Sequence, residues 1–161
     1  MLAALPLAAR ADEYTDVNRL VQARQHVQAL ARADQYLTGK PRDPQMRFLK
    51  GVILAETGKR AEAIETYTQL TQEFPELPEP YNNLAVLYAQ QGQYDKAREA
   101  LEGAVRANPN YATAHENLGD VYAKLAGQSY TRAQQIDPAN TSVPTKLTLV
   151  RQMLSPPAKA R

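Results

Sequence analysis

Cysteine and tryptophan are absent from the sequence, and phenylalanine occurs only twice among its 161 residues. Without cysteine the chain forms no disulfide and offers no thiolate for metal binding or catalysis. The 19 basic and 17 acidic residues give a formal net charge of +2, so we expect no strongly basic surface for nucleic acid. Once the apolar first residues are set aside, no stretch is long enough to span a membrane.

Signatures of catalysis and cofactor binding are missing as well. The two histidines, His26 and His115, have no second histidine at ligand spacing, which argues against a metal site. The chain contains no glycine-rich phosphate loop, no nucleophile elbow and no paired-carboxylate motif. The sequence therefore predicts a binding protein that is not an enzyme and carries no cofactor.

What the sequence does contain is a helical hairpin, predicted within residues 78–110. Gln91-Gly92-Gln93 separates two helical patterns, and Asn108-Pro109 ends the second, because a residue before proline is pushed out of the helical region. Each predicted helix carries one apolar stripe at helical spacing, formed by Tyr81, Leu84, Ala85 and Tyr88 in the first helix and by Ala97, Leu101, Ala104 and Val105 in the second.

A fixed spacing connects this hairpin to its neighbours. Small residues suited to a close helix contact recur at one interval, at Gly51, Ala85 and Gly119, and so do the closing prolines Pro41, Pro75 and Pro109. This repeat interval, about 34 residues, is the period of one class of stacked helical hairpins. The hairpin also fills the pattern W-x-x-L-G-x-x-Y, A-x-x-x-F, P, with tyrosine for tryptophan and leucine for phenylalanine. The chain therefore resembles the tetratricopeptide repeat family, which implies an all-α superhelix of stacked hairpins.

The resemblance divides the chain into about three and a half repeats. We expect a repeat domain over residues 12–140, a C-terminal capping helix over 141–154 and a disordered basic tail over 155–161. Within the domain, the repeats are expected at residues 12–43, 44–77, 78–111 and, in truncated form, 112–140.

The truncated repeat predicts one long helix in place of a hairpin. Pro138 follows Pro109 too early to complete the repeat interval, so five residues are missing where a turn belongs, and a continuous stripe runs from Ala114 to Ile136. We expect a single helix from Ala112 to Ile136 whose apolar stripe needs cover. The segment Ser142–Leu154, with Ser142 as its N-cap, can supply that cover, and the alternative is the same helix of a second molecule in a homodimer.

In the family, the first helix of each repeat lines a concave groove, which implies a binding site here. Asn83 and Asn117 take the same position of that helix in successive repeats, and a carboxamide can pair with a peptide backbone. In the alternative interpretation, each asparagine bonds a neighbouring helix, and Phe48 and Val52 pack in the core. The family's clamp for a C-terminal carboxylate lacks its basic residues here. The groove residues that we predict are Phe48, Val52, Asn82, Asn83, Val86, Gln90, Asn117 and Asp120.

The first eleven residues, MLAALPLAARA, look like the end of a signal peptide. They are apolar, and Ala9-Arg10-Ala11 precedes the polar Asp12, as signal peptidase requires. The basic n-region is missing, which favours a start further upstream, and an ordinary helix start is the alternative. Residues 77–125 also resemble small cell-envelope proteins of Gram-negative bacteria. We therefore expect a periplasmic or exported protein, with a cytoplasmic one as the alternative.

Taken together, these patterns predict a non-catalytic scaffold that holds an extended peptide or a helix of a partner protein in its concave groove. Two alternatives remain open. The chain is then either a structural module that self-associates through residues 112–136, or an accessory that positions an enzyme without catalysing a reaction.

Overall fold

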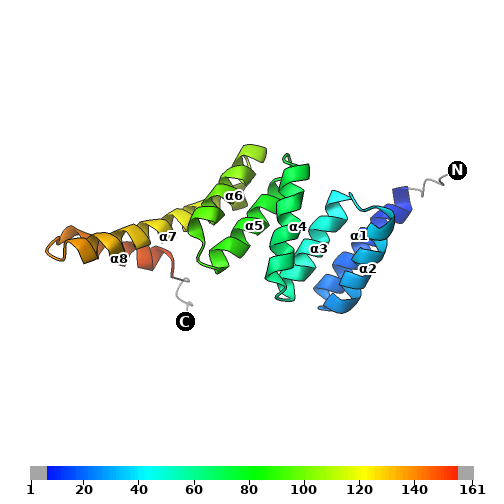
Figure 1. Ribbon diagram of the computed structural model, residues 1–161, viewed down its shortest axis with the longest axis horizontal. Helices are drawn as coiled ribbons and strands as arrows, with labels where there is room; N and C mark the ends of the chain where they lie inside the picture. Colours follow the sequence, from blue (N-terminus) through cyan, green and yellow to red (C-terminus); the bar gives the residue numbers. More distant parts are fainter. Residues whose placement is uncertain (1–6, 156–161) are drawn as a thin grey trace, which may run out of the picture.

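The computed structural model describes residues 7–155, and within this range the chain is a row of helices without a strand (Figure 1). The predicted all-α superhelix is confirmed. Of the signal-peptide prediction, residues 1–6 lie outside the described residues, as does the tail beyond Ser155. The helices are α1 (Leu7–Gln22), α2 (His26–Gly39), α3 (Pro44–Glu56), α4 (Arg60–Glu73), α5 (Pro78–Gln90), α6 (Tyr94–Ala107), α7 (Ala112–Ile136) and α8 (Ser142–Met153).

The first six helices form three hairpins whose turns share one backbone conformation. Gly58 and Gly92 have φ angles of 77° and 71°, in the left-handed region that glycine enters without steric cost. Arg24, one repeat interval before Gly58, takes the same role with a φ of 56°. The first hairpin therefore turns at the expected place although its sequence lacks the turn glycine.

Close helix contacts inside the hairpins depend on small residues. A Cβ atom built on Gly51 would lie 2.6 Å from Cε1 of Tyr67, so this side of α3 approaches α4 closely only because it lacks a side chain. Ala85 takes the equivalent place in α5 and is buried. Gly119 was expected at a third contact of this kind, and that prediction is wrong. Nothing lies within 4 Å of its Cβ position, because α8, the helix that folds back on α7, packs against its second half, beyond Gly119.

Arg47 is the main charged residue of this core. It is 8% exposed and donates to the Oε1 atom of Glu73 at 2.9 Å and to that of Gln69 at 3.3 Å, both on α4. Tyr81 takes the equivalent position in the next repeat and packs its ring against Gly103 of α6. A buried arginine, paired with a carboxylate nearer the surface, thus fills in one repeat the position that an aromatic ring fills in the next.

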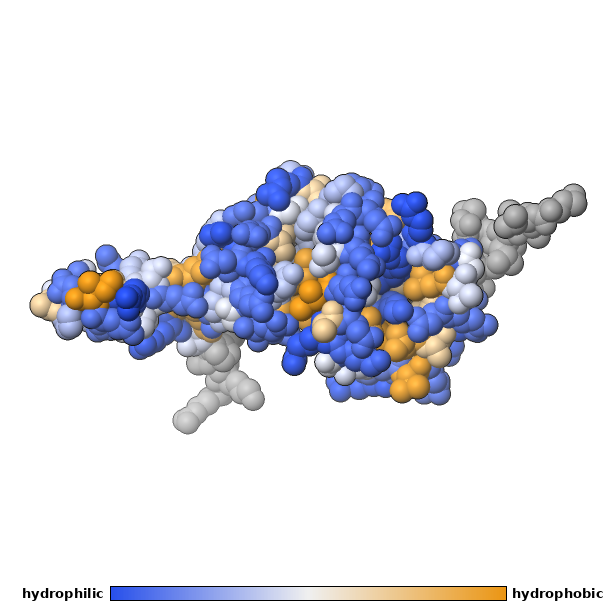
Figure 2. All heavy atoms as spheres, viewed as in Figure 1, coloured by the Kyte–Doolittle hydropathy of each residue, from blue (hydrophilic) through white to orange (hydrophobic). Residues whose placement is uncertain are grey.

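Beyond the hairpins, α7 runs without interruption from Ala112 to Ile136, as the five missing residues predicted. Its second half packs against α8, and the two helices project from the body as an arm, which we define as residues 123–153 (Figure 1). Figure 2 shows this arm as a narrow extension of the molecule. Cover for α7 therefore comes from the same chain, through Val143 and Leu147 of α8.

Two details of the arm differ from expectation. The N-cap is Thr141 and not Ser142, whose backbone N–H and hydroxyl both donate to the Oδ1 atom of Asn140. The helix α8 also packs on a different face of α7 from the predicted stripe, because Tyr122 and Ile136 of that stripe remain 48% and 71% exposed. None of the helices within residues 7–155 is long and apolar enough to cross a membrane.

Candidate functional site

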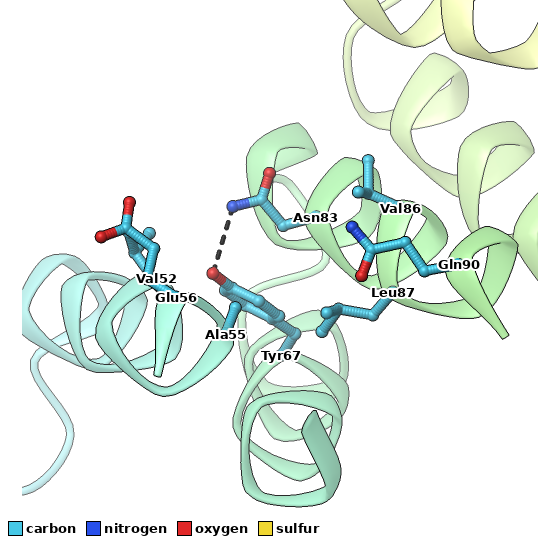
Figure 3. A pocket seen from close by; sticks show the side chains of 8 residues that line it. All are labelled: Val52, Ala55, Glu56, Tyr67, Asn83, Val86, Leu87 and Gln90. Carbon is cyan, nitrogen blue, oxygen red and sulfur yellow. Dashed lines mark hydrogen bonds between the residues drawn. The ribbon is translucent and has the colours of Figure 1, made fainter. Parts of the chain in front are cut away.

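Two adjoining cavities lie side by side on the face formed by α3, α5 and α7. The first, of about 330 Å³, lies between α3 and α5 with Tyr67 of α4 at its base (Figure 3). The second, of about 340 Å³, lies between α5 and α7 with Leu101 and Tyr94 of α6 at its base. Val86 and Gln90 line both, so the cavities form one groove.

The second cavity repeats the first along the chain. Each of the eight residues that line the first has its counterpart, one repeat interval later, in the lining of the second. The pairs are Val52 and Val86, Ala55 and Ala89, Glu56 and Gln90, Tyr67 and Leu101, Asn83 and Asn117, Val86 and Asp120, Leu87 and Val121, and Gln90 and Lys124.

A chain of side-chain hydrogen bonds crosses the groove from α7 to α4. Asn117 donates through Nδ2 to the Oδ1 atom of Asn82 at 2.8 Å, and Asn82 donates to Asn83 at 3.5 Å. Asn83 in turn donates through Nδ2 to the hydroxyl oxygen of Tyr67 at 3.1 Å (Figure 3). Both groove asparagines thus bond a neighbouring helix, as the alternative interpretation expected. Each uses one N–H in doing so and keeps a second.

Tyr67 is the base of the first cavity and is 1% exposed. Burial raises the pKa of Tyr67 to about 12, and the negative charge of Glu56 acts in the same direction. The hydrogen bond from Asn83 opposes this by lowering the pKa. The phenol is therefore neutral at physiological pH. It accepts the bond from Asn83, and no side chain within residues 13–155 accepts a bond from its own proton.

Most of the predicted groove residues lie on the cavity walls. Val52 and Asn83 line the first cavity, Asn117 and Asp120 line the second, and Val86 and Gln90 line both. Asn82 does not, because it is 5% exposed and its amide is held between Asn117 and Asn83. Phe48 does not either, since its ring packs against that of Tyr67 with centroids 5.8 Å apart.

Some of the lining residues that were not predicted lie on the second helices of two hairpins, and others lie on the first helices. Tyr67 and Leu101 reach the groove from α4 and α6, whereas the predicted residues all came from first helices. Both residues lie behind the first helices and line the groove only through the gap between two successive first helices, which the pattern of a single helix does not reveal. The repeat interval could have found Glu56 and Lys124, both of which align with Gln90.

Charge is sparse in the groove. Glu56 lies at the wall of the first cavity and is bonded at 2.9 Å by Nε2 of His26. Asp120 and Lys124 line the second cavity and form no ion pair within the described residues. No cluster of three or more potential metal ligands occurs among residues whose placement is described. The groove therefore offers mainly apolar contact and neutral hydrogen bonding, with Glu56, Asp120 and Lys124 as its charged groups.

Two family models, each described as a tetratricopeptide repeat, match residues 6–78 and 54–125, which together cover most of the chain. The chain belongs to the tetratricopeptide repeat (TPR) family. The three hairpins and the first half of α7 are its TPR units, and the arm is an addition to the repeat pattern.

Solved TPR structures resemble this one. YrrB, described as a TPR protein with an unusual peptide-binding site, matches with a TM-score of 0.60 and 27% identity over 65% of this chain and 54% of its own. The Sgt2 TPR domain from Aspergillus fumigatus matches with a TM-score of 0.71 and 17% identity over 80% and 87%. TTC0263 from Thermus thermophilus matches with a TM-score of 0.65 and 20% identity over 90% and 82%. The chain spans about half the length of YrrB, and the latter two share the fold alone.

Proposed function

We propose that this TPR protein is a non-catalytic scaffold that holds an extended peptide or a helix of a partner protein in the groove of the two cavities. The observation that carries the proposal is the one-to-one repetition of the cavity linings at the repeat interval. A surface that offers two successive pockets lined from equivalent positions fits a ligand that is itself periodic, as a polypeptide is. The description of YrrB as a peptide-binding TPR protein supports the same class of ligand.

The groove has the chemistry that such a ligand needs. Val86 stands between the cavities with 39% of its surface exposed, and supplies apolar contact at the centre. On either side, Asn83 and Asn117 each keep one N–H. These donors can bond backbone carbonyls without reading side chains, while the apolar walls accept side chains from the ligand.

Site-specific photo-cross-linking in cells tests this proposal. A photoreactive amino acid at Gln90, which lines both cavities, is expected to give an adduct with a partner protein. The matched control places it at Glu99 of α6, which is exposed and lines neither cavity. Adding Val86→Arg, which puts a long charged side chain between the cavities, is expected to lower the adduct yield about tenfold. Equal adducts from both positions, or an adduct insensitive to Val86→Arg, would contradict the groove.

We also propose that the protein works in the cell envelope. The support is the sequence alone, namely the small residues Ala9 and Ala11 before Asp12 and the resemblance of residues 77–125 to envelope proteins. Removal of the first eleven residues would shorten α1 but leave Tyr14 and Val17, which pack against α2 and α3. Periplasmic protein is expected to begin at Asp12 by N-terminal sequencing. An intact N-terminus in the cytoplasmic fraction would refute export.

A further inference from the structure

The arm carries a second groove, separate from the two cavities. It lies between α7 and α8 and has a volume of about 490 Å³. Its floor is formed by Leu147 and Val150 of α8 and by Leu154, the C-cap of that helix. Gly127 of α7 widens it, since a Cβ there would lie 3.4 Å from Cγ1 of Val150. Two helices packed together bury one face of each, so the groove is where a third helix would complete a bundle.

The rim of this arm groove is basic. Lys124, Arg132 and Arg151 line it, together with neutral glutamines and a threonine, and no carboxylate does. None of the three forms an ion pair within the described residues, and Arg132 only donates to Gln135 at 3.4 Å. When a ligand brings carboxylates to these unpaired cations, the new ion pairs offset the free-energy cost of removing water from the cations.

The arm differs in charge from the rest of the chain. Residues 123–153 hold four basic residues and one acidic residue, whereas residues 1–122 hold 13 basic and 16 acidic residues. Residues 154–161 add two more basic residues and no acidic one. These residues therefore do not supply the missing negative charge.

The most acidic segment of a second copy does not supply it either. Acidic residues concentrate on and after α4, between Glu62 and Glu79, but the apolar residues of α4 that could enter a groove, Tyr67 and Leu70, are 1% and 0% exposed. Glu73 is already paired with Arg47. The most acidic segment of the chain thus offers no free apolar ridge beside its carboxylates.

We propose that the arm groove binds an amphipathic, acidic helix of a different protein. Its apolar ridge contacts the α8 floor and Gly127, and its carboxylates reach the rim cations. Lys124 and Arg132 are separated by about two turns of α7, which places them about 12 Å apart along the helix axis. The matching acidic residues are therefore two turns apart in the ligand. A lipid surface fits less well, because the apolar floor lies below the cations in a concavity.

A peptide selection against the full chain tests the proposal. The library displays helical peptides with a fixed leucine ridge and flanking positions randomised among Glu, Lys, Gln and Ser. Enriched peptides are expected to carry glutamates two turns apart, and fluorescence anisotropy is expected to show weaker binding at high salt. Arg132→Glu and Arg151→Glu should each weaken binding about tenfold. Two control variants should leave peptide binding unchanged. They are the matched reversal Arg60→Glu, at an exposed residue outside every groove described above, and Val86→Arg.

The remaining outcomes overturn the proposal, with circular dichroism confirming that each variant is folded. Enrichment of Lys or of uncharged peptides, or no enrichment at all, would do so. Binding abolished by Val86→Arg and not by the arm reversals would assign the peptides to the cavities instead. Vesicles of phosphatidylglycerol that bind wild type but not the arm variants would identify a lipid surface. A dimer in light scattering that the arm variants dissociate would identify a second copy.

Discussion

At the scale of single residues, positions one repeat interval apart share a role more often than they share a side chain. Arg24 turns the first hairpin where Gly58 and Gly92 turn the next two, and Arg47 takes the place of Tyr81. The spacing predicts the position in the fold because helix packing fixes it. It does not predict which chemistry fills the position, since a paired arginine and an aromatic ring both satisfy a nearly buried site.

The glycines at the close-contact position of the repeat give the sharpest test at residue scale. Gly51→Ala is expected to destabilise the protein by about 1–3 kcal/mol, because the new methyl group would overlap the buried ring of Tyr67. Gly119→Ala, at the equivalent position of α7, meets no atom within 4 Å and is expected to stabilise by up to about 1 kcal/mol through helix propensity. Urea unfolding, followed by circular dichroism, measures both.

The two variants control for each other, because they make the same chemical change in the same repeat position. Midpoints that shift in the same direction would show that the repeat spacing, and not the local packing, decides the effect. Such shifts would also contradict the conclusion that no second helix packs against α7 at Gly119.

At the scale of elements, the length of α7 was predictable and the placement of α8 was not. Five missing residues remove a turn, and a stripe without a turn can only continue as one helix. The face on which α8 packs depends on the connecting residues 137–141 and on contacts between the two helices, such as that of Val150 with Gly127. These are tertiary contacts that the periodicity of a single helix does not contain.

Gly127 is the point at which the arm can be detached. Gly127→Pro should cost about 3 kcal/mol or more, because proline removes a helical hydrogen bond and clashes with the preceding turn. Hydrogen exchange followed by mass spectrometry is expected to show lost protection in α8 and the second half of α7. Protection in α1–α4 should be unchanged, and Gly127→Ala should increase it in the arm. Uniform loss along the chain would mean that the arm does not open separately.

At the scale of the whole molecule, the repeat spacing predicted which face carries the groove. The residues that it placed there came from the first helices alone, so Val52, Val86 and Asn117 were found while Tyr67 was not. The arm groove was not foreseen at all, because it lies between an element that breaks the repeat and one that follows it. A repeat pattern predicts contacts between equivalent hairpins, whereas this groove forms between α7 and α8, which do not make a repeat hairpin.

Lys124 is the one residue that lines both the second cavity and the arm groove. Its ammonium group can neutralise a carboxylate from one side or the other, but not two at full strength. Two negatively charged ligands would therefore antagonise each other, and by thermodynamic reciprocity each would lose the same factor in affinity. Under both proposals, Lys124 is therefore expected to couple the two grooves, so that an acidic ligand in one weakens binding of an acidic ligand in the other.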